Sequence, residues 1–270
     1  MCKDRLISAL SAAVPTSDCL GSGRWCVDVT TSHRLTIERD AVVDLLLTGF
    51  ESGVEGSVDI VVSPWARLRV VEVLATEDAK SQLCIKLNEG AECHITQIIT
   101  TTAKSNVVAS LDGRAARFEL GGAFLVSGSE RADVTVDVKH NVSDCASRTT
   151  FKGVASQSAV GKFSGLVYVA PDAQRTDSEQ LSRNITLGDA RIDALPQLEI
   201  YADDVKCSHG ATVGQMDDEA VLYMRQRGLS LATAKRLQIE GFVSDVVLRS
   251  GIEECREVLL ECLEQKLEKL

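Results

Sequence analysis

Apolar and polar residues alternate along most of the chain with the two-residue period that is typical of β-strands. The alternating segments are short and closely spaced. They cover residues 25–29, 34–38, 57–62, 66–74, 82–87, 93–98, 116–120, 132–138, 148–152, 161–169 and 197–201. Many short strands at close spacing predict an all-β core, built as a sandwich, a barrel or a solenoid.

The connections between these segments favour a solenoid slightly over a sandwich. Two-residue hairpin signals are scarce, because Asp112-Gly113 is the single Asn-Gly or Asp-Gly pair in the chain,. Glycine followed by small or acidic residues recurs before strands, at Gly90, Gly128 and Gly188. Such corners suit a chain that winds onward through short turns. Their spacing is not constant, so the sequence does not predict a clean repeat.

Both ends of the chain are expected to be helical. Residues 1–24 predict a short amphipathic helix and a loop rich in Gly and Ser; Asp4 and two serines weaken a faint likeness to a secretion signal,. Residues 25–215 form the β core, and residues 216–270 form a helical subdomain. In that subdomain Asp217 and Asp218 can cap a helix that ends at Gly228. Ser230 can cap a second helix, with one face near Leu231, Ala234, Leu237, Phe242 and Val246,.

The third C-terminal helix carries a marked apolar stripe. Docking on the chain's own core and docking on a partner protein explain this stripe equally well, and the sequence leaves both open. The stripe consists of Ile252, Cys255, Leu259, Cys262, Leu263, Leu267 and Leu270.

Composition narrows the class of protein. The chain has 270 residues, of which 44% are apolar and 25% charged, so a sizeable core is available,. A net charge of −10 argues against a partner with a nucleic-acid backbone and against anionic membranes,. No apolar run approaches the 18 residues or so of a membrane span. The nine cysteines are irregularly spaced without a Cys-x-x-Cys pair, which indicates neither a disulfide framework nor a zinc ribbon,. We therefore expect a reducing compartment, the cytoplasm.

Cys207 and His209 are the strongest candidates for chemistry. On a strand, Val205, Cys207 and His209 share one face, and the thiol and imidazole lie about 6.6 Å apart at the backbone,. Both can reach one metal ion at bond lengths of about 2.0–2.3 Å. A closed four-ligand site would need further ligands from elsewhere in the chain or from a second subunit. From spacing alone, a buried thiol and a hydrogen-bonded imidazole are the better explanation.

Other chemical motifs are weak. His33, His94 and His140 are isolated, and the adjacent Cys93 and His94 point to opposite faces of a strand,. The sequence has no phosphate loop, no nucleophile elbow and no His-Glu-x-x-His motif. The acidic pairs at residues 203–204 and 217–218 could form the calcium site of a polysaccharide lyase. A turn and a helix cap explain them more simply.

One long stretch carries a family resemblance. Residues 196–214, PQLEIYADDVKCSHGATVG, together with residues 148–153, 161–165, 173–177, 217–219 and 223–228, resemble the SufD family of the SUF iron–sulfur cluster assembly system. The resemblance extends over about residues 60–250. It implies a right-handed parallel β-helix with a C-terminal helical subdomain. It also implies a non-enzymatic scaffold subunit that pairs with SufB through the β-helix and binds the SufC ATPase through residues 217–270.

The resemblance also implies roles for individual residues. It makes His209 a ligand of transient iron or a nascent cluster at the SufB interface, and Cys207 a participant beside it. The chain alone would then hold no cofactor. The cysteine that marks SufB would align near Ser182, so the chain is similar to SufD and not to SufB. About 25 residues precede the first strand, whereas SufD proteins have a longer N-terminal helical region.

Two other functions remain as alternatives. A SufD-like homodimer could dock SufC without any direct role in cluster formation. An exported β-helix lyase would act on acidic polysaccharide, and it would need a groove lined by carboxylates with basic partners.

Overall fold

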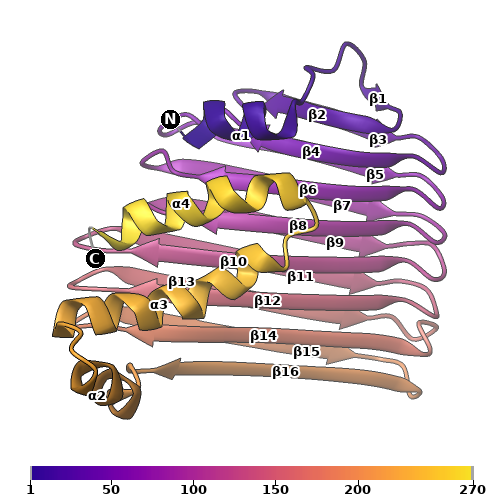
Figure 1. Cartoon of the computed structure of the whole chain (residues 1–270). Helices are drawn as coiled ribbons and strands as arrows, with labels where there is room; N and C mark the ends of the chain where they lie inside the picture. The colour runs from indigo at the N-terminus through magenta and orange to yellow at the C-terminus, as the bar shows by residue number, and fades with distance from the viewer. Residues whose placement is uncertain (1, 269–270) are drawn as a thin grey trace.

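The computed structural model describes residues 2–268, and in it the chain winds into a parallel β-helix with two eight-stranded sheets (Figure 1). From β3 onward, every strand pairs in parallel with the strand two places earlier, so the predicted β-helix is confirmed and a sandwich is excluded. The odd-numbered sheet contains β1 (Cys19–Leu20), β3 (Ser32–Ile37), β5 (Glu55–Val62), β7 (Ala79–Leu87), β9 (Ala103–Leu111), β11 (Arg131–His140), β13 (Val160–Val169) and β15 (Arg191–Ile200). The even-numbered sheet contains β2 (Gly23–Asp28), β4 (Val42–Thr48), β6 (Arg67–Leu74), β8 (Glu92–Ile99), β10 (Arg117–Val126), β12 (Ala146–Ala155), β14 (Thr176–Thr186) and β16 (Val205–Gly214).

The corners of the β-helix repeat more regularly than the sequence indicated. Asp40, Trp65, Gly90 and Ala115 all have positive φ, and they follow one another at intervals of 25 residues. The N–H of Trp65 donates to Glu89 O at 2.9 Å, one coil further on. The prediction that no clean repeat exists is therefore wrong for residues 40–115. Later coils are longer, with corners at Asp144 and Arg175, and these longer coils obscure the period.

Apolar side chains from both sheets fill the interior. The aromatic rings of Phe124, Phe151 and Phe163 lie in a row, with centroids 6.0 and 5.5 Å apart. Gly122 leaves room for Phe151, since a Cβ at position 122 would come within 2.1 Å of that ring. Burial of these side chains at roughly 25 cal/mol per Å² provides most of the driving force for coil stacking.

A carboxyl group interrupts the apolar interior. Glu72 is fully buried, and its Oε1 accepts a 2.6 Å hydrogen bond from the Ser81 hydroxyl, while the Gln97 amide contacts its Oε2. The same Gln97 nitrogen donates to Ser105 at 2.8 Å. Burial raises the pKa of Glu72, although these two hydrogen bonds to the carboxylate act against the shift,.

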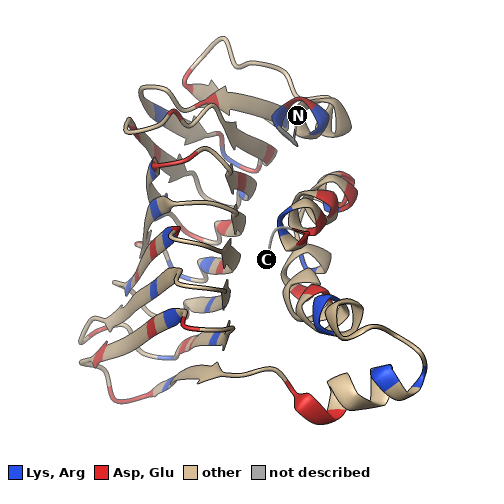
Figure 2. Cartoon of the chain, turned by 90° about the vertical axis from the view of Figure 1, so that its left-hand side faces the viewer, with Lys and Arg blue, Asp and Glu red and all other residues tan. Residues whose placement is uncertain are grey.

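The helices cover one half of the even-numbered sheet. They are α1 (Cys2–Leu10), α2 (Asp218–Gln226), α3 (Leu231–Leu248), the short 3₁₀ helix η1 (Glu253–Cys255) and α4 (Arg256–Leu267). Figures 1 and 2 show α3 and α4 lying against the outer face of this sheet, with α1 above them on the first coils. Leu46, Val71 and Val154 of the sheet join Val243 and Leu259 of the helices in a second apolar core.

That core decides how the stripe of the third C-terminal helix is covered. Leu259, Cys262, Leu263 and Leu267 are buried against the chain's own sheet, so the stripe itself is not a partner surface. Leu270 lies outside the described residues. Two buried lysines reinforce the attachment: Lys152 of β12 donates to Asp245 of α3 at 2.9 Å, and Lys266 of α4 pairs with Glu130.

The predicted buried face of α3 is partly wrong. The helix begins after the Ser230 cap as expected, but Leu231 and Leu237 are 46% and 40% exposed. The buried face instead contains Ile239, Val243, Val246 and Val247, together with Ala234. Leu237 and Ile239 are two residues apart and therefore lie on nearly opposite sides of the helix,.

Three long strands had no clear signal in the sequence, each for a different reason. β4 is buried on both faces because α1 lies over it and its outward Leu46 joins the second apolar core, so its residues do not alternate. β9 points small residues such as Ala103 and Ser105 inward. The inward side chains of β14 are polar: Ser178, Gln180, Ser182 and Asn184. No helix among residues 2–268 combines the length and apolar character needed to cross a membrane.

Candidate functional site

The last coil leaves the end of the β-helix open. β15 and β16 are the terminal strands of their sheets, so one edge of each strand pairs with no other strand in the described part of the chain. Large apolar side chains are exposed on this coil, including Leu195, Ile200, Tyr201 and Val213. An exposed strand edge with apolar side chains is a template for pairing with another chain.

Cys207 and His209 lie in the same inward-facing register on β16. Their Cα partners on β14 are the buried Ser178 and Gln180. Cys207 is half-buried and packs against the small cluster that contains Val167. His209 is exposed, and its ring makes no hydrogen bond or ion pair within residues 2–268. Because no further coil closes the interior here, both side chains face the open end of the β-helix.

The thiol of Cys207 is protonated at neutral pH. Burial raises its pKa, and a hydrogen bond from the backbone of Ser178 opposes that shift,. Only the thiolate binds a metal, so capture of a cation at Cys207 must release a proton. The protonated Cys207 thiol is therefore a poor nucleophile, and it becomes a metal ligand only when cation binding drives the loss of its proton.

Polar side chains line the interior directly behind this coil. The Nε2 atom of His140 lies 2.9 Å from the Ser147 hydroxyl, which lies 2.8 Å from the hydroxyl of Ser178. Burial lowers the pKa of His140 to about 4, so the ring is neutral. Ser182 is also buried, and the Asn184 amide donates to it at 2.9 Å. The hydroxyl at the position where the resemblance places the SufB cysteine thus faces inward.

The acidic pairs proposed for a lyase have structural roles. Asp217 Oδ1 accepts hydrogen bonds from the N–H groups of Glu219 and Ala220 at 3.0 and 3.1 Å, which caps α2. The backbone N–H of Asp204 donates to the Gln174 side chain at 2.8 Å in the last corner. Within residues 2–268, no three His, Cys, Asp or Glu side chains are placed to hold one metal ion.

The remaining histidines and cysteines lie apart from this coil. His33 lies on β3, where its Nε2 is 2.9 Å from Asp28 O. Cys93 is buried inside the β-helix while His94 lies on the outer face, as their adjacent positions predicted. Cys255 is buried, which raises the pKa of its thiol to about 11. Cys262 is disulfide-bonded, which the irregular cysteine spacing did not predict.

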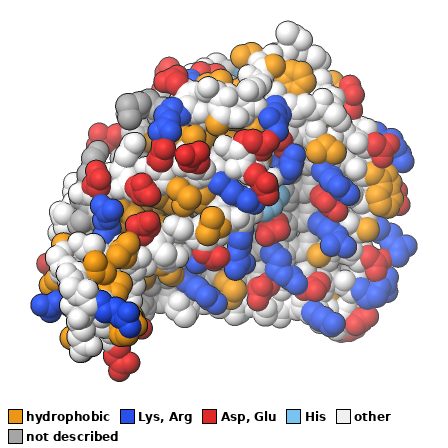
Figure 3. Space-filling view, viewed as in Figure 1, with side chains coloured by type: hydrophobic (Ala, Val, Ile, Leu, Met, Phe, Trp, Pro, Cys, Tyr) orange, Lys and Arg blue, Asp and Glu red, His pale blue; other side chains and the backbone are white. Residues whose placement is uncertain are grey.

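A row of charged side chains that the sequence analysis missed runs along the outside of the even-numbered sheet. Figure 3 shows acidic and basic side chains interspersed over the part of this face that the helices leave open. Except for Arg69 and His94, neighbouring members of the row alternate in charge. Arg69, His94, Glu119 and Arg148 border a groove of about 680 Å³. The signal was present in the sequence, because its central members recur every 25 residues. In strand order the row is Arg24, Asp44, Arg69, His94, Glu119, Arg148 and Glu179.

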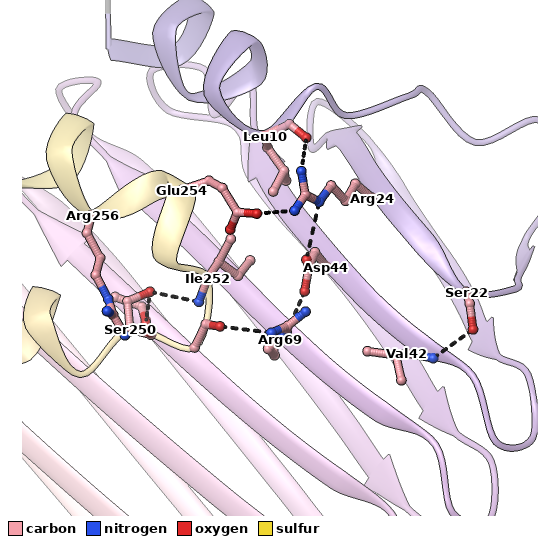
Figure 4. A network of polar contacts seen from close by, with 12 residues as sticks. Leu10, Ser22, Arg24, Val42, Asp44, Arg69, Ser250, Ile252, Glu254 and Arg256 are labelled. Atoms are coloured by element: carbon pink, nitrogen blue, oxygen red, sulfur yellow. Dashed lines mark hydrogen bonds and ion pairs between the residues drawn. The ribbon is translucent and has the colours of Figure 1, made fainter.

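The first members of the row hold the helices in place. Figure 4 shows Asp44 between Arg24 and Arg69, with its Oδ1 accepting from Arg69 Nε at 2.5 Å. Arg69 also donates to Gly251 O at 3.1 Å, and Arg24 pairs with Glu254. This network joins the first coils to the connection between α3 and α4, so its role is structural.

Comparison with known proteins places this fold in a family. The family model described as "SUF system FeS cluster assembly, SufBD core domain" matches residues 23–242. The chain is 34% identical over 165 residues to the iron–sulfur cluster assembly protein SufD of Escherichia coli, which is 61% of this chain and 39% of that protein. It is 28% identical over 225 residues to an iron–sulfur cluster assembly SufBD family protein of Mycobacterium leprae, covering 78% of this chain and 57% of that protein.

A third relative is SufD of Bacillus subtilis, 37% identical over 116 residues, which cover 43% of this chain and 26% of that protein. The chain thus spans less than two thirds of the length of the curated relatives it matches. The matched region of the family model runs from the first strand of the even-numbered sheet, through the last coil, into α3. The chain belongs to the SufBD core family of the SUF iron–sulfur cluster assembly system.

Proposed function

We propose that the chain is a non-enzymatic, cytoplasmic scaffold subunit for the assembly of iron–sulfur clusters, and that a SufB-like partner covers its last coil. The observation that carries this proposal is the open inward face of β16, where Cys207 and His209 lie together. Membership of the family and the names of the relatives support iron or a nascent cluster as the cargo.

The number of ligands supports a shared site. Thiolate and imidazole groups are the ligands that iron–sulfur centres take from proteins, and a cluster needs about four of them. Cys207 and His209 supply two, and the described residues bring no third candidate beside them. The missing ligands would therefore come from the partner across the open coil. This coil also has the exposed apolar residues that an interface core needs, among them Leu195 and Tyr201,.

The outer faces of α2 and α3 provide a second docking surface, which we assign to an ATPase of the SufC type. Leu222 and Tyr223 of α2 are more than half exposed. Leu229, Leu231 and Leu237 continue the same apolar character into α3. This surface replaces the apolar stripe of α4 as the candidate docking site, because the chain's own sheet already covers that stripe.

An anaerobic co-purification tests the proposal. The tagged chain is co-expressed with SufB and SufC from one source, and the eluate is scanned for iron–sulfur absorption. We expect a three-protein complex whose cluster absorption is lost in His209→Ala and retained in the control His33→Ala. The control removes a histidine from β3 at the opposite end of the β-helix.

Two results would contradict the proposal. If neither partner co-elutes, the chain has no role in this assembly. If His209→Ala keeps the cluster at the parent level, the chain is a docking module for the ATPase, alone or as a homodimer through the same apolar edge.

A further inference from the structure

Gln180 is a buried amide whose polar atoms have no partner among residues 2–268. Its side chain is fully buried on the inward face of β14, and within these residues neither Nε2 nor Oε1 forms a hydrogen bond. The neighbouring inward hydroxyls of the same strand are paired, Ser178 with Ser147 and Ser182 with Asn184. Asn184 of the same strand leaves only its Oδ1 unpaired, whereas both polar atoms of Gln180 are unpaired. Most buried polar groups in proteins have partners, so this amide needs an explanation.

The fold makes space for this amide. A Cβ on Gly165, across the interior on β13, would lie only 2.4 Å from Gln180 Nε2. The glycine therefore leaves the room that the amide occupies. An apolar side chain of the same length would fill this space without leaving a donor and an acceptor unpaired.

The position of Gln180 in the register indicates what it serves. Thr149, Gln180 and His209 are consecutive members of one inward row, so His209 lies one strand beyond Gln180, about 4.8 Å away at the backbone,. The imidazole of His209 is exposed and lacks a partner in the described residues, so water can hydrogen-bond to its ring nitrogens. Once a partner protein covers the last coil, that imidazole loses its water.

A histidine that binds a metal through one ring nitrogen needs a hydrogen-bond partner for the other nitrogen. We propose that Gln180 is the positioning residue for His209: in the assembled complex its amide oxygen accepts the N–H of the non-ligating ring nitrogen. This contact fixes the tautomer and orientation of the ring toward the iron or cluster. The inference rests on the proposed function and adds a residue that does not itself touch the cargo.

The test uses two variants of nearly equal size and one control. Gln180→Met keeps the length of the side chain but removes both polar atoms, whereas Gln180→Glu keeps an acceptor oxygen at the same distance. Thr149→Val changes the equally buried member of the same row that is one strand further from His209. Each variant is measured as the isolated full chain in urea and as the co-purified complex with SufB and SufC. Ferrous iron affinity of the complex is measured anaerobically by chelator competition.

We expect Gln180→Met to unfold at the same or a higher urea concentration than the parent, since no hydrogen bond is lost. The complex should form with unchanged stoichiometry but bind ferrous iron 10–100-fold more weakly. Gln180→Glu should restore most of that affinity, and Thr149→Val should leave it unchanged.

Three results would overturn the inference. A lower urea midpoint or failure of Gln180→Met to fold would mean that the amide is structurally paired. Iron affinity within twofold of the parent in Gln180→Met, where His209→Ala has lost iron, removes Gln180 from the site and leaves the proposed function intact. If His209→Ala itself keeps its iron, the proposed function fails and the role of Gln180 fails with it.

Discussion

Replacement of Glu72 by glutamine should stabilise the chain at neutral and alkaline pH. The carboxyl is fully buried and forms no ion pair within residues 2–268, and burial raises its pKa. Because the pKa of Glu72 is higher in the folded than in the unfolded chain, full stability is present below the unfolded-state pKa of about 4.3. Stability is lost as the pH rises from there through the folded-state pKa. The free energy of unfolding therefore decreases by about 1.4 kcal/mol for each pH unit in that window. Glutamine cannot ionise and so removes this loss.

The hydrogen bonds of the cluster can survive this change. The new amide oxygen can accept from Ser81, which now donates to Glu72 at 2.6 Å. When the Gln97 amide turns over, the new amide nitrogen can donate to Gln97 Oε1, which is buried and forms no hydrogen bond within residues 2–268. The Ser105 hydroxyl, which now accepts from Gln97 Nε2, can then donate to the same oxygen. The substitution therefore isolates the ionisation of Glu72 from its contacts.

Urea denaturation between pH 4 and pH 9 measures the effect. We expect the difference in unfolding free energy between Glu72→Gln and the parent to be near zero at pH 4 and to increase with pH. Glu51→Gln, at an exposed position, controls for the loss of one negative charge. A difference that does not change across the pH range, or a less stable variant at pH 8, would show that burial does not raise the pKa of Glu72.

Three further outcomes follow from single contacts. His140→Gln should make the free energy of unfolding depend less on pH between pH 6.5 and pH 4. In the parent, burial lowers the pKa of His140 to about 4, so in this range the histidine is protonated only in the unfolded chain and stability falls by about 1.4 kcal/mol for each pH unit of acidification,. The same pH dependence in variant and parent, measured by urea titration, would contradict this. Gly165→Ala should destabilise the chain by about 1–3 kcal/mol, because the new Cβ would lie 2.4 Å from Gln180 Nε2,. Adding Gln180→Ala should recover part of this loss in a double-mutant cycle, and simple additivity of the two changes would refute the contact. Asp217→Ala should weaken α2 by about 1 kcal/mol through the lost N-cap, visible as faster hydrogen exchange in α2 but not in the β-helix, and unchanged exchange would mean that the cap is not used,.

Local signals in the sequence were enough for most elements. Alternation located most of the strands, and the residues Asp217, Gly228 and Ser230 marked helix ends that the structure reproduces. These signals work because each depends on residues within about four positions of one another. The placement of Val205, Cys207 and His209 on one face of a strand followed from the same rule, and the structure shows that this face points inward.

Strands with polar or doubly covered faces escaped detection. β14 has the polar inward residues Ser178, Gln180, Ser182 and Asn184, which look like a loop in a linear pattern. The strand forms because parallel pairing with β12 and β16 satisfies its backbone, and because neighbouring polar side chains mostly pair with one another.

The identity of the strands and helix caps was contained in the order of the residues, since those features form between close neighbours along the chain. The rows that define the molecule join residues 20–31 positions apart, such as Arg69 with His94 and Gln180 with His209. Their alignment depends on the length of each coil and on how the corners stack. For the same reason, the covering of the α4 stripe by the even-numbered sheet and the unpaired state of Gln180 emerge only when all coils are packed together.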